Sequence, residues 1–185
     1  MIVMTASLLD TRRHLTDFDS IRIGHVLTDT LIIGSGVAGA RAAIEAARYG
    51  LVTLVTKGGF EESATYYAQG GIAVALGNDD SAAMHLEDTM RVGCGLNRPD
   101  AVKLLVTEAP RRIEELLSWG IELDRVDGEL ALGREGGHSV NRIVHAHGDQ
   151  TGRELTKTLK RRVQETENIR VFENCFVIDF ITLDG

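Results

Sequence analysis

The spacing of apolar and polar residues predicts a β-α-β unit early in the chain. Residues 30–33 and 51–55 are short apolar runs of the kind found in buried strands. Residues 40–48, between them, are rich in alanine and predict a helix. A helix that joins two neighbouring strands over so short a distance indicates that the strands are parallel.

Further along, the pattern predicts three more helices. The first begins at Asp80 or Ser81 as its N-cap and runs to about Val92. The second begins at Pro99 and runs towards Gly120, broken or kinked by Pro110. In the third, residues 151 and 154 are a threonine and a glutamate with capping-box spacing, and the predicted buried stripe is Leu155, Leu159 and Val163.

The remaining segments predict loops and short strands. Residues 58–75 form a long loop rich in Gly, Ser, Thr, Tyr and Gln, and long loops in compact domains are usually functional. Residues 121–132 predict a hairpin or loop around Asp127 and Gly128. Strands are expected over residues 169–172 and 176–181, with a short one over 21–27.

Composition narrows the class of protein. The chain has 185 residues, of which 43% are hydrophobic and 25% charged, as in an ordinary globular domain. A net charge of −7 argues against general affinity for nucleic acid or anionic membranes and favours small-molecule partners. The two cysteines, Cys94 and Cys175, fit neither a disulfide framework nor a zinc site, which agrees with a reducing cytoplasm. We expect no signal peptide and no membrane span, because the apolar residues 1–9 lack a basic leading region.

The turn after the first strand has the pattern G-x-G-x-x-G, with glycines at 34, 36 and 39. Gly34 allows the tight turn, Gly36 lets the main chain approach phosphate groups, and Gly39 allows close contact between helix and strand. The N–H groups and the positive end of the following helix favour a bound anion. This segment therefore predicts a site for the pyrophosphate of a dinucleotide.

Lys57 follows the second strand, where NAD-binding proteins have an acidic residue that accepts bonds from the ribose hydroxyls. A lysine cannot accept a hydrogen bond, so unmodified NAD is disfavoured. FAD, or NADP with its extra phosphate, fits better, although Lys57 could also be an ordinary solvated lysine at a strand end.

Three histidines, His138, His145 and His147, raise the question of a metal site, since His-x-His spacing can chelate. No carboxylate or cysteine set accompanies them in a familiar arrangement. We therefore predict no metal site here and expect these residues to shape a loop.

Three blocks together resemble the N-terminal part of the L-aspartate oxidases. These are flavoproteins related to the flavin subunits of succinate dehydrogenase and fumarate reductase. The blocks are I-G-S-G-V-A-G at residues 33–39, T-Y-Y-A-Q-G-G-I-A at 65–73, and R-E-G-G-H-S at 134–139 with 145–154 behind it. The resemblance begins near Asp29 and implies an α/β fold. It would be a Rossmann-like FAD/NAD(P)-binding domain with a parallel sheet and packing helices, incomplete at its C-terminus. Residues 1–28 would be an extension, and 29–185 the first part of the FAD-binding domain.

The resemblance also implies where FAD binds. The pyrophosphate would lie at the first block, the adenosine side near Lys57 and the main chain of residues 176–177, and the flavin against residues 64–71. N–H groups of this last loop would reach flavin N5 and the ring carbonyl oxygens, although Tyr66 and Tyr67 could instead be core residues. Relatives that oxidise succinate attach the flavin to a histidine just before the threonine of this loop. Ala64 stands there, so FAD should be held noncovalently. The implied cofactor-binding residues are Gly34, Ser35, Gly36, Val37, Ala38, Gly39, Lys57, Ala64, Thr65, Tyr66, Tyr67, Ala68, Gln69, Gly70, Gly71, Phe176 and Val177.

Glu135 is the residue to which the resemblance gives a role with substrate. A carboxylate beside the substrate ammonium forms a charge-assisted hydrogen bond and discriminates against succinate or fumarate, which have no amine. Arg134 and Glu135 could instead form a surface ion pair.

The activity implied is oxidation of L-aspartate to iminoaspartate, with oxygen or fumarate as the electron acceptor. This is the first step towards quinolinate and NAD, and quinolinate synthase would be a candidate partner. The catalytic arginine of such enzymes lies beyond Gly185, so we expect a fragment that is inactive alone. Three alternatives stay open: a succinate dehydrogenase or fumarate reductase flavin subunit, an NADP-dependent reductase that uses Lys57, and a nucleotide-binding module without activity.

Overall fold

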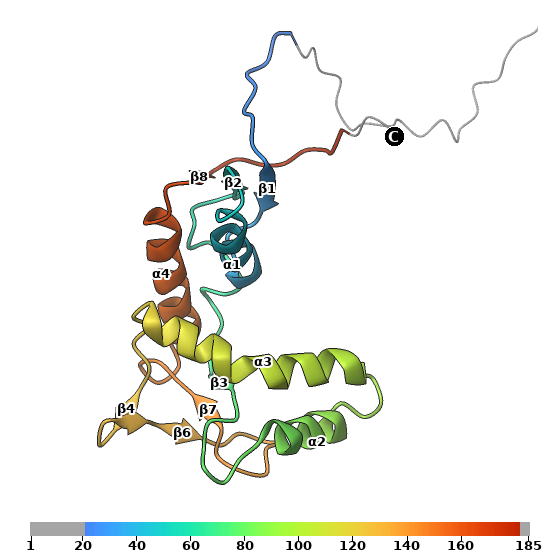
Figure 1. Ribbon diagram of the computed structural model, residues 1–185, viewed down its shortest axis with the longest axis vertical. Coiled ribbons are helices and arrows are strands. Elements are labelled where there is room, and N and C mark those ends of the chain that lie inside the picture. Colours follow the sequence, from blue (N-terminus) through green and yellow to red (C-terminus); the bar gives the residue numbers. More distant parts are fainter. Residues whose placement is uncertain (1–20, 182–185) are drawn as a thin grey trace, which may run out of the picture.

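A three-stranded parallel sheet forms the first layer of the fold in the computed structural model, which describes residues 21–181 (Figure 1). Its strands are β1 (Thr30–Ile33), β2 (Val52–Val55) and β8 (Ile169–Phe172), in the order β1-β2-β8. All four residues of β2 are buried, as expected for a central strand with both faces covered. The predicted parallel β-α-β unit is confirmed.

Two helices pack against each other beside this sheet. Helix α1 (Val37–Ala46) connects β1 to β2 and begins three residues before the predicted start at residue 40. Helix α4 (Thr151–Gln164) contacts α1 and leads into β8. The buried core between these elements includes Ala40, Ala43, Leu54, Leu159 and Val163. The predicted stripe of Leu155, Leu159 and Val163 on α4 is therefore confirmed.

The start of α4 differs from the prediction. Gln150 is the N-cap, and Thr151 is already the first helical residue. The Thr151 hydroxyl accepts a hydrogen bond from the Ala146 N–H (3.1 Å), so it serves the preceding loop instead of the helix end. Glu154 accepts a bond from the Glu122 N–H (3.3 Å). The predicted capping box is wrong because both side chains are used by other segments.

A second pair of helices packs together away from the sheet. Helix α2 (Ala82–Val92) begins after Ser81, whose side chain accepts a bond from the Met84 N–H (3.2 Å), so the predicted cap is confirmed. Helix α3 (Pro99–Ser118) begins with proline, as predicted, and continues through Pro110 without a break. Gly120 follows it with φ +80°, a conformation that glycine adopts without strain.

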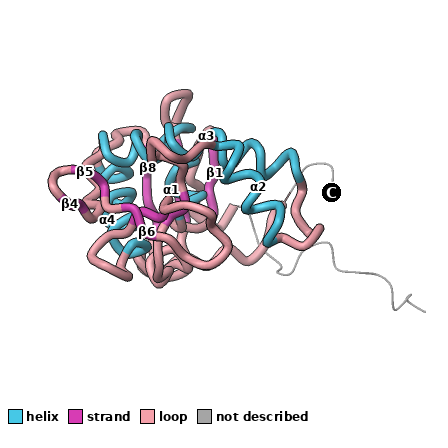
Figure 2. Tube along the Cα trace, turned by 90° about the horizontal axis from the view of Figure 1, so that it is seen from below, coloured by secondary structure: helices cyan, strands magenta, loops and turns pink. Residues whose placement is uncertain are grey.

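Short antiparallel strands complete the fold. Strands β3 (Ile72–Ala73), β7 (Ile143–Val144) and β6 (Leu132–Gly133) form one small sheet. Strands β4 (Arg125–Val126) and β5 (Glu129–Leu130) form the hairpin predicted around residues 127–128, where both φ angles are positive. Figure 2 shows this hairpin at one end of the molecule and α2 at the other.

Two predicted strands are wrong. Residues 21–27 and 176–181 are irregular, and most of their large apolar side chains are exposed. An apolar run becomes a strand only where a neighbouring strand accepts its backbone hydrogen bonds, and none does so within residues 21–181. Most of the predicted N-terminal extension lies outside the described residues, as does the segment on which the signal-peptide prediction depends. Within residues 21–181, no helix combines the length and apolar character needed to cross a bilayer.

Candidate cofactor and substrate site

A cavity of about 380 Å³ opens at the carboxyl ends of β1 and β2. This is where open α/β sheets bind their ligands. The wall of the cavity brings together predicted residues from four segments that are distant in the sequence. They are Gly34, Ser35 and Gly36 after β1, Lys57 after β2, Ala64 and Thr65 in the following loop, and Phe176 and Val177 after β8.

The glycine-rich turn has the geometry that its sequence predicts. Gly34 has φ +102°, which favours glycine, and a Cβ on Gly39 would lie 1.9 Å from the Gly34 carbonyl oxygen. Gly36 is the N-cap of α1, and a Cβ there would come within 3.3 Å of Thr65 Oγ1. The turn therefore keeps the main chain open at the start of α1, where an anion is stabilised by the helix end.

Ser35 has a structural task as well as its place in the cavity wall. Its hydroxyl donates to the Phe60 carbonyl oxygen (2.8 Å) and lies 3.1 Å from Thr56 Oγ1. The side chain thus connects the turn to the segment after β2. Only the main chain of Ser35 remains available to bind a ligand.

The loop of residues 64–71 is held from two sides. The hydroxyl of Thr65 accepts a bond from the Val37 N–H at the start of α1 (3.0 Å). On the other side, the Gly152 N–H donates to the Ala68 carbonyl oxygen (3.2 Å). A Cβ on Gly71 would lie 2.3 Å from a methyl group of Ile143, so the end of the loop lies directly on β7. These contacts fix the loop beside the glycine-rich turn.

The two tyrosines of this loop are placed differently. Their rings meet edge to face with centroids 5.2 Å apart. Tyr66 is half-buried, and the Arg153 guanidinium lies 6.0 Å from the centre of its ring. Tyr67 is 70% exposed, so the alternative that it is a core residue is wrong. Ala68 and Gln69 are also exposed.

Glu135 lies beside this same loop. Its Oε1 atom is 3.5 Å from His145 Nε2 and 3.7 Å from the position that a Cβ on Gly70 would take. The carboxylate is 56% exposed and so remains accessible. Arg134 donates instead to the Ser139 carbonyl oxygen (3.4 Å), and the Glu135 carboxylate contacts His145. The block that begins at residue 134 is therefore in contact with the block of residues 65–73.

A buried ionic network, which the sequence analysis missed, anchors the loop that carries Glu135. Arg142 is fully buried, 2.8 Å from an oxygen of Asp80 and 3.0 Å from an oxygen of Asp88. Asp88 also accepts bonds from the Ser139 N–H and hydroxyl, both 2.7 Å long. These two bonds, with the nearby charges of Arg142 and Arg91, lower the Asp88 pKa to about 2. The buried residues of α2 are His85 and Asp88, so the pattern of apolar residues along this helix gave no signal for the network.

The three histidines of the sequence analysis do not share one site. His138 contacts His85 edge to face, with ring centres 5.8 Å apart. His145 lies beside Glu135, and His147 lies near Glu122 and Glu154. Burial, followed by the positive charge of Arg142, lowers the pKa of His85.

With this geometry established, the chain can be compared with known proteins. Residues 29–185 match a family model described as "FAD binding domain". The chain belongs to this family. The predicted α/β fold and FAD as cofactor are thereby confirmed. The structure fits FAD, because the glycine-rich turn borders a cavity and has no room for a side chain at Gly39.

Individual relatives agree with the predicted resemblance. An L-aspartate oxidase of rice, *Oryza sativa*, named as chloroplastic, is 45% identical over 83% of this chain and 24% of its own length. An L-aspartate oxidase of *Streptomyces coelicolor* is 43% identical over 85% of this chain and 27% of its own length. The chain thus spans about a quarter of the length of these relatives.

Solved structures are similar in the same region. A quinol-fumarate reductase with menaquinol has a TM-score of 0.79 and 33% identity, covering 84% of this chain and 27% of that one. A *Mycobacterium smegmatis* Sdh1 complex with UQ1 has a TM-score of 0.73 and 37% identity, covering 80% and 27%. Both are similar to this chain in fold and in sequence.

Proposed function

We propose that the protein of which this chain is part oxidises L-aspartate to iminoaspartate with noncovalently held FAD, and with oxygen or fumarate as acceptor. The names of two similar relatives, both L-aspartate oxidases, support the reaction. The observation that carries the proposal is the position of the Glu135 carboxylate beside Gly70.

The residues around the cavity have distinct tasks in this proposal. The main chain of residues 34–39 binds the pyrophosphate, and Lys57, Phe176 and Val177 border the adenosine side of the same cavity. Residues 65–71 support the flavin with main-chain N–H groups. Ala64 lines the cavity with only a methyl group, so no covalent bond to the flavin forms there. Bound FAD would supply the oxidising power as the acceptor of a hydride from the substrate Cα, while the substrate nitrogen loses a proton.

Glu135 orients the substrate. Its carboxylate accepts a charge-assisted hydrogen bond from the substrate ammonium, and so favours aspartate over succinate. His145 contacts the same carboxylate at 3.5 Å and limits the positions that it can take. The contacts of the loop of residues 64–71 with α1 and α4 keep this loop and Glu135 in one arrangement. Hydride transfer requires such fixed positions of cofactor and substrate.

The test is Glu135→Gln in the natural full-length protein. Glutamine keeps the size of the side chain and removes its charge. We expect the second-order rate constant for reduction of the flavin by L-aspartate, followed at 450 nm without oxygen, to be lower by about 10- to 100-fold, the value of one charged hydrogen bond. Reduction by succinate should not become slower. An unchanged rate constant for aspartate would contradict the role of Glu135.

A succinate dehydrogenase or fumarate reductase subunit is the second candidate, because the similar solved structures include such enzymes. Ala64 and Glu135 argue against it. Turnover of succinate without turnover of aspartate would decide for it.

Two further parts of the proposal concern location and partners. The cysteines Cys94 and Cys175 are exposed and unbonded, which supports a reducing compartment such as the cytoplasm. Iminoaspartate has a C=N bond that water hydrolyses. This supports its direct use by a following enzyme such as quinolinate synthase.

A further inference from the structure

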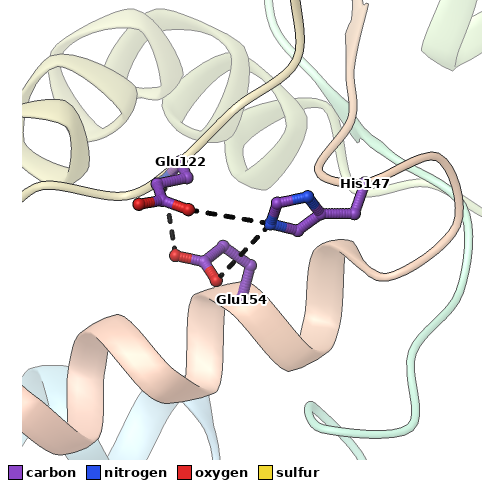
Figure 3. A group of neighbouring side chains, drawn as sticks. All are labelled: Glu122, His147 and Glu154. Carbon is purple, nitrogen blue, oxygen red and sulfur yellow. Dashed lines mark hydrogen bonds and ion pairs between the residues drawn. The ribbon is translucent and has the colours of Figure 1, made fainter.

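Three side chains that can bind metal converge at the N-terminal end of α4, from three separate segments (Figure 3). Glu122 follows α3, His147 lies in the loop before α4, and Glu154 is in the first turn of α4. His147 Nε2 is 3.8 Å from Glu122 Oε2 and 4.0 Å from Glu154 Oε2. All three ligand atoms lie within 4.8 Å of one another.

The backbone holds these side chains in place. The carboxylate of Asp124 accepts bonds from the N–H groups of His147 (2.8 Å) and Gly148 (3.0 Å), which fixes the loop that carries the imidazole. Glu154 accepts the Glu122 N–H through Oε1, so its other oxygen, Oε2, is the one that faces His147. The Glu154 carboxylate and the main chain of residues 122 and 147 are therefore positioned before any ligand arrives, which lowers the cost of binding.

The charges at this point favour a cation. The Glu154 side chain is only 6% exposed, and a second carboxylate lies within 4.8 Å of it. Two carboxylates so close together repel each other unless positive charge lies between them. Lys157 Nζ is 3.4 Å from Glu154, but this lysine is 63% exposed, and the ion pair that it forms within residues 21–181 is with Glu154 alone.

We propose that Glu122, His147 and Glu154 form a binding site for a divalent transition-metal ion of the zinc type. One imidazole nitrogen and two carboxylate oxygens are zinc ligands, and three protein ligands leave a fourth position for water. Ligand atoms around zinc are about 3.4 Å apart, so the two separations from His147 Nε2, 3.8 and 4.0 Å, must each shorten by about half an ångström. The side chains of Glu122 and His147 are exposed and can make this adjustment. The imidazole disfavours Ca²⁺ and Mg²⁺, which take oxygen ligands.

A bound ion would connect segments that support the cofactor loop. Gly152, whose N–H bonds to Ala68, lies two residues before Glu154 in the same helical turn. The ion would fasten this turn to residues 122 and 147. This site is separate from the residues proposed to bind FAD and aspartate, so the inference does not depend on the proposed function.

The test is Zn²⁺ binding by the natural full-length protein, measured by competition with a chromophoric chelator. The wild type should bind one equivalent, and His147→Asn and Glu122→Gln should each weaken binding more than about tenfold. Asparagine is chosen because His147 has φ +49°, a conformation that asparagine tolerates. Exposed residues outside the cluster, changed as His25→Ala and Glu167→Gln, are the matched controls and should leave the affinity unchanged.

Two further measurements do not depend on the chelator. Co²⁺ in place of Zn²⁺ should give the visible absorption of a four-coordinate site in the wild type and not in His147→Asn. Zn²⁺ should raise the Tm of the wild type more than that of either variant, since it binds the folded state. Equal Zn²⁺ affinity in the wild type and both cluster variants would overturn the proposal, as would loss of binding in a control variant instead.

Discussion

Gly152 shows how one residue at the start of a helix can control a loop on another element. A Cβ at this position would lie 2.0 Å from the Thr65 carbonyl oxygen and 2.6 Å from that of Ala68. Both atoms are backbone atoms, so no side-chain rotation relieves the clash. Helix α4 and the loop of residues 64–71 can approach this closely only because residue 152 has no side chain.

The change Gly152→Ala should therefore destabilise the protein. In an unobstructed helix, alanine stabilises by up to about 1 kcal/mol relative to glycine. Here the clash forces the loop to move, and we expect a loss of about 1–3 kcal/mol in the free energy of unfolding, together with weaker FAD binding. Urea unfolding and FAD titration measure the two effects. Gly24→Ala is the control, because nothing lies within 4 Å of a Cβ there. Equal stability of the two variants would show that the loop yields freely.

At the level of residues, the sequence predicts that several proposed cofactor-binding residues come together at one cavity, but it does not predict the contacts that support them. Gly36, Lys57, Ala64 and Phe176, from four segments, line one cavity as expected, because the G-x-G-x-x-G turn and the parallel strands fix where they meet. The pairing of Arg142 with Asp80, 62 positions apart, follows from tertiary packing. No local pattern contains that information.

Among the helices, α2 has a clear start signal. Ser81 has the extended backbone of an N-cap, and its hydroxyl accepts the Met84 N–H. This bond satisfies one of the N–H groups that a helix leaves without a partner in its first turn. Helix α2 also carries Asp88, so its position affects the loop that holds Glu135.

Removal of the cap in Ser81→Ala should lower the free energy of unfolding by about 1 kcal/mol, the usual value for a lost N-cap side chain. Urea unfolding of the two proteins measures the difference. Ser81→Asp is the matched variant, because aspartate also accepts the bond and adds a favourable charge at the helix start. If the alanine and aspartate variants were equally destabilised, the cap would not be the cause.

Elements could be predicted where their own residues decide them. Within residues 21–181, the strands β1, β2 and β8, the hairpin and the four helices follow from local pattern and turn residues. The two-residue strands β3, β6 and β7 have no sequence signal of their own, because only pairing defines them. The strand predicted at residues 176–181 fails for the same reason, since its apolar run has no neighbouring strand within the described residues. The capping box at Thr151 fails because a tertiary contact takes its hydroxyl.

For the whole molecule, the contact between α2 and the loop of residues 133–142 makes stability depend on pH. Asp88 has a pKa of about 2 in the folded protein, against an ordinary value of 3.8, because it accepts two bonds from Ser139 and lies near Arg142 and Arg91. His85 also has a lowered pKa, against an ordinary value of 6.5, because it is buried and lies near the charges of Arg142 and His138, which outweigh those of Asp80 and Asp88. Both groups bind protons more readily when the chain is unfolded, so both make the folded state less stable as the pH falls.

We expect the free energy of unfolding to decline in two steps on acidification. The His85 step begins as the pH falls below about 6.5, where the unfolded chain takes up a proton that the folded protein resists. The Asp88 step follows between about pH 4 and pH 2. Urea unfolding at a series of pH values measures both. His85→Leu should flatten the upper step, and Asp88→Asn the lower one. Overall stability can differ between the variants, so the slope against pH is the decisive quantity. An upper slope that is the same in His85→Leu and the wild type would rule out the buried histidine as its source.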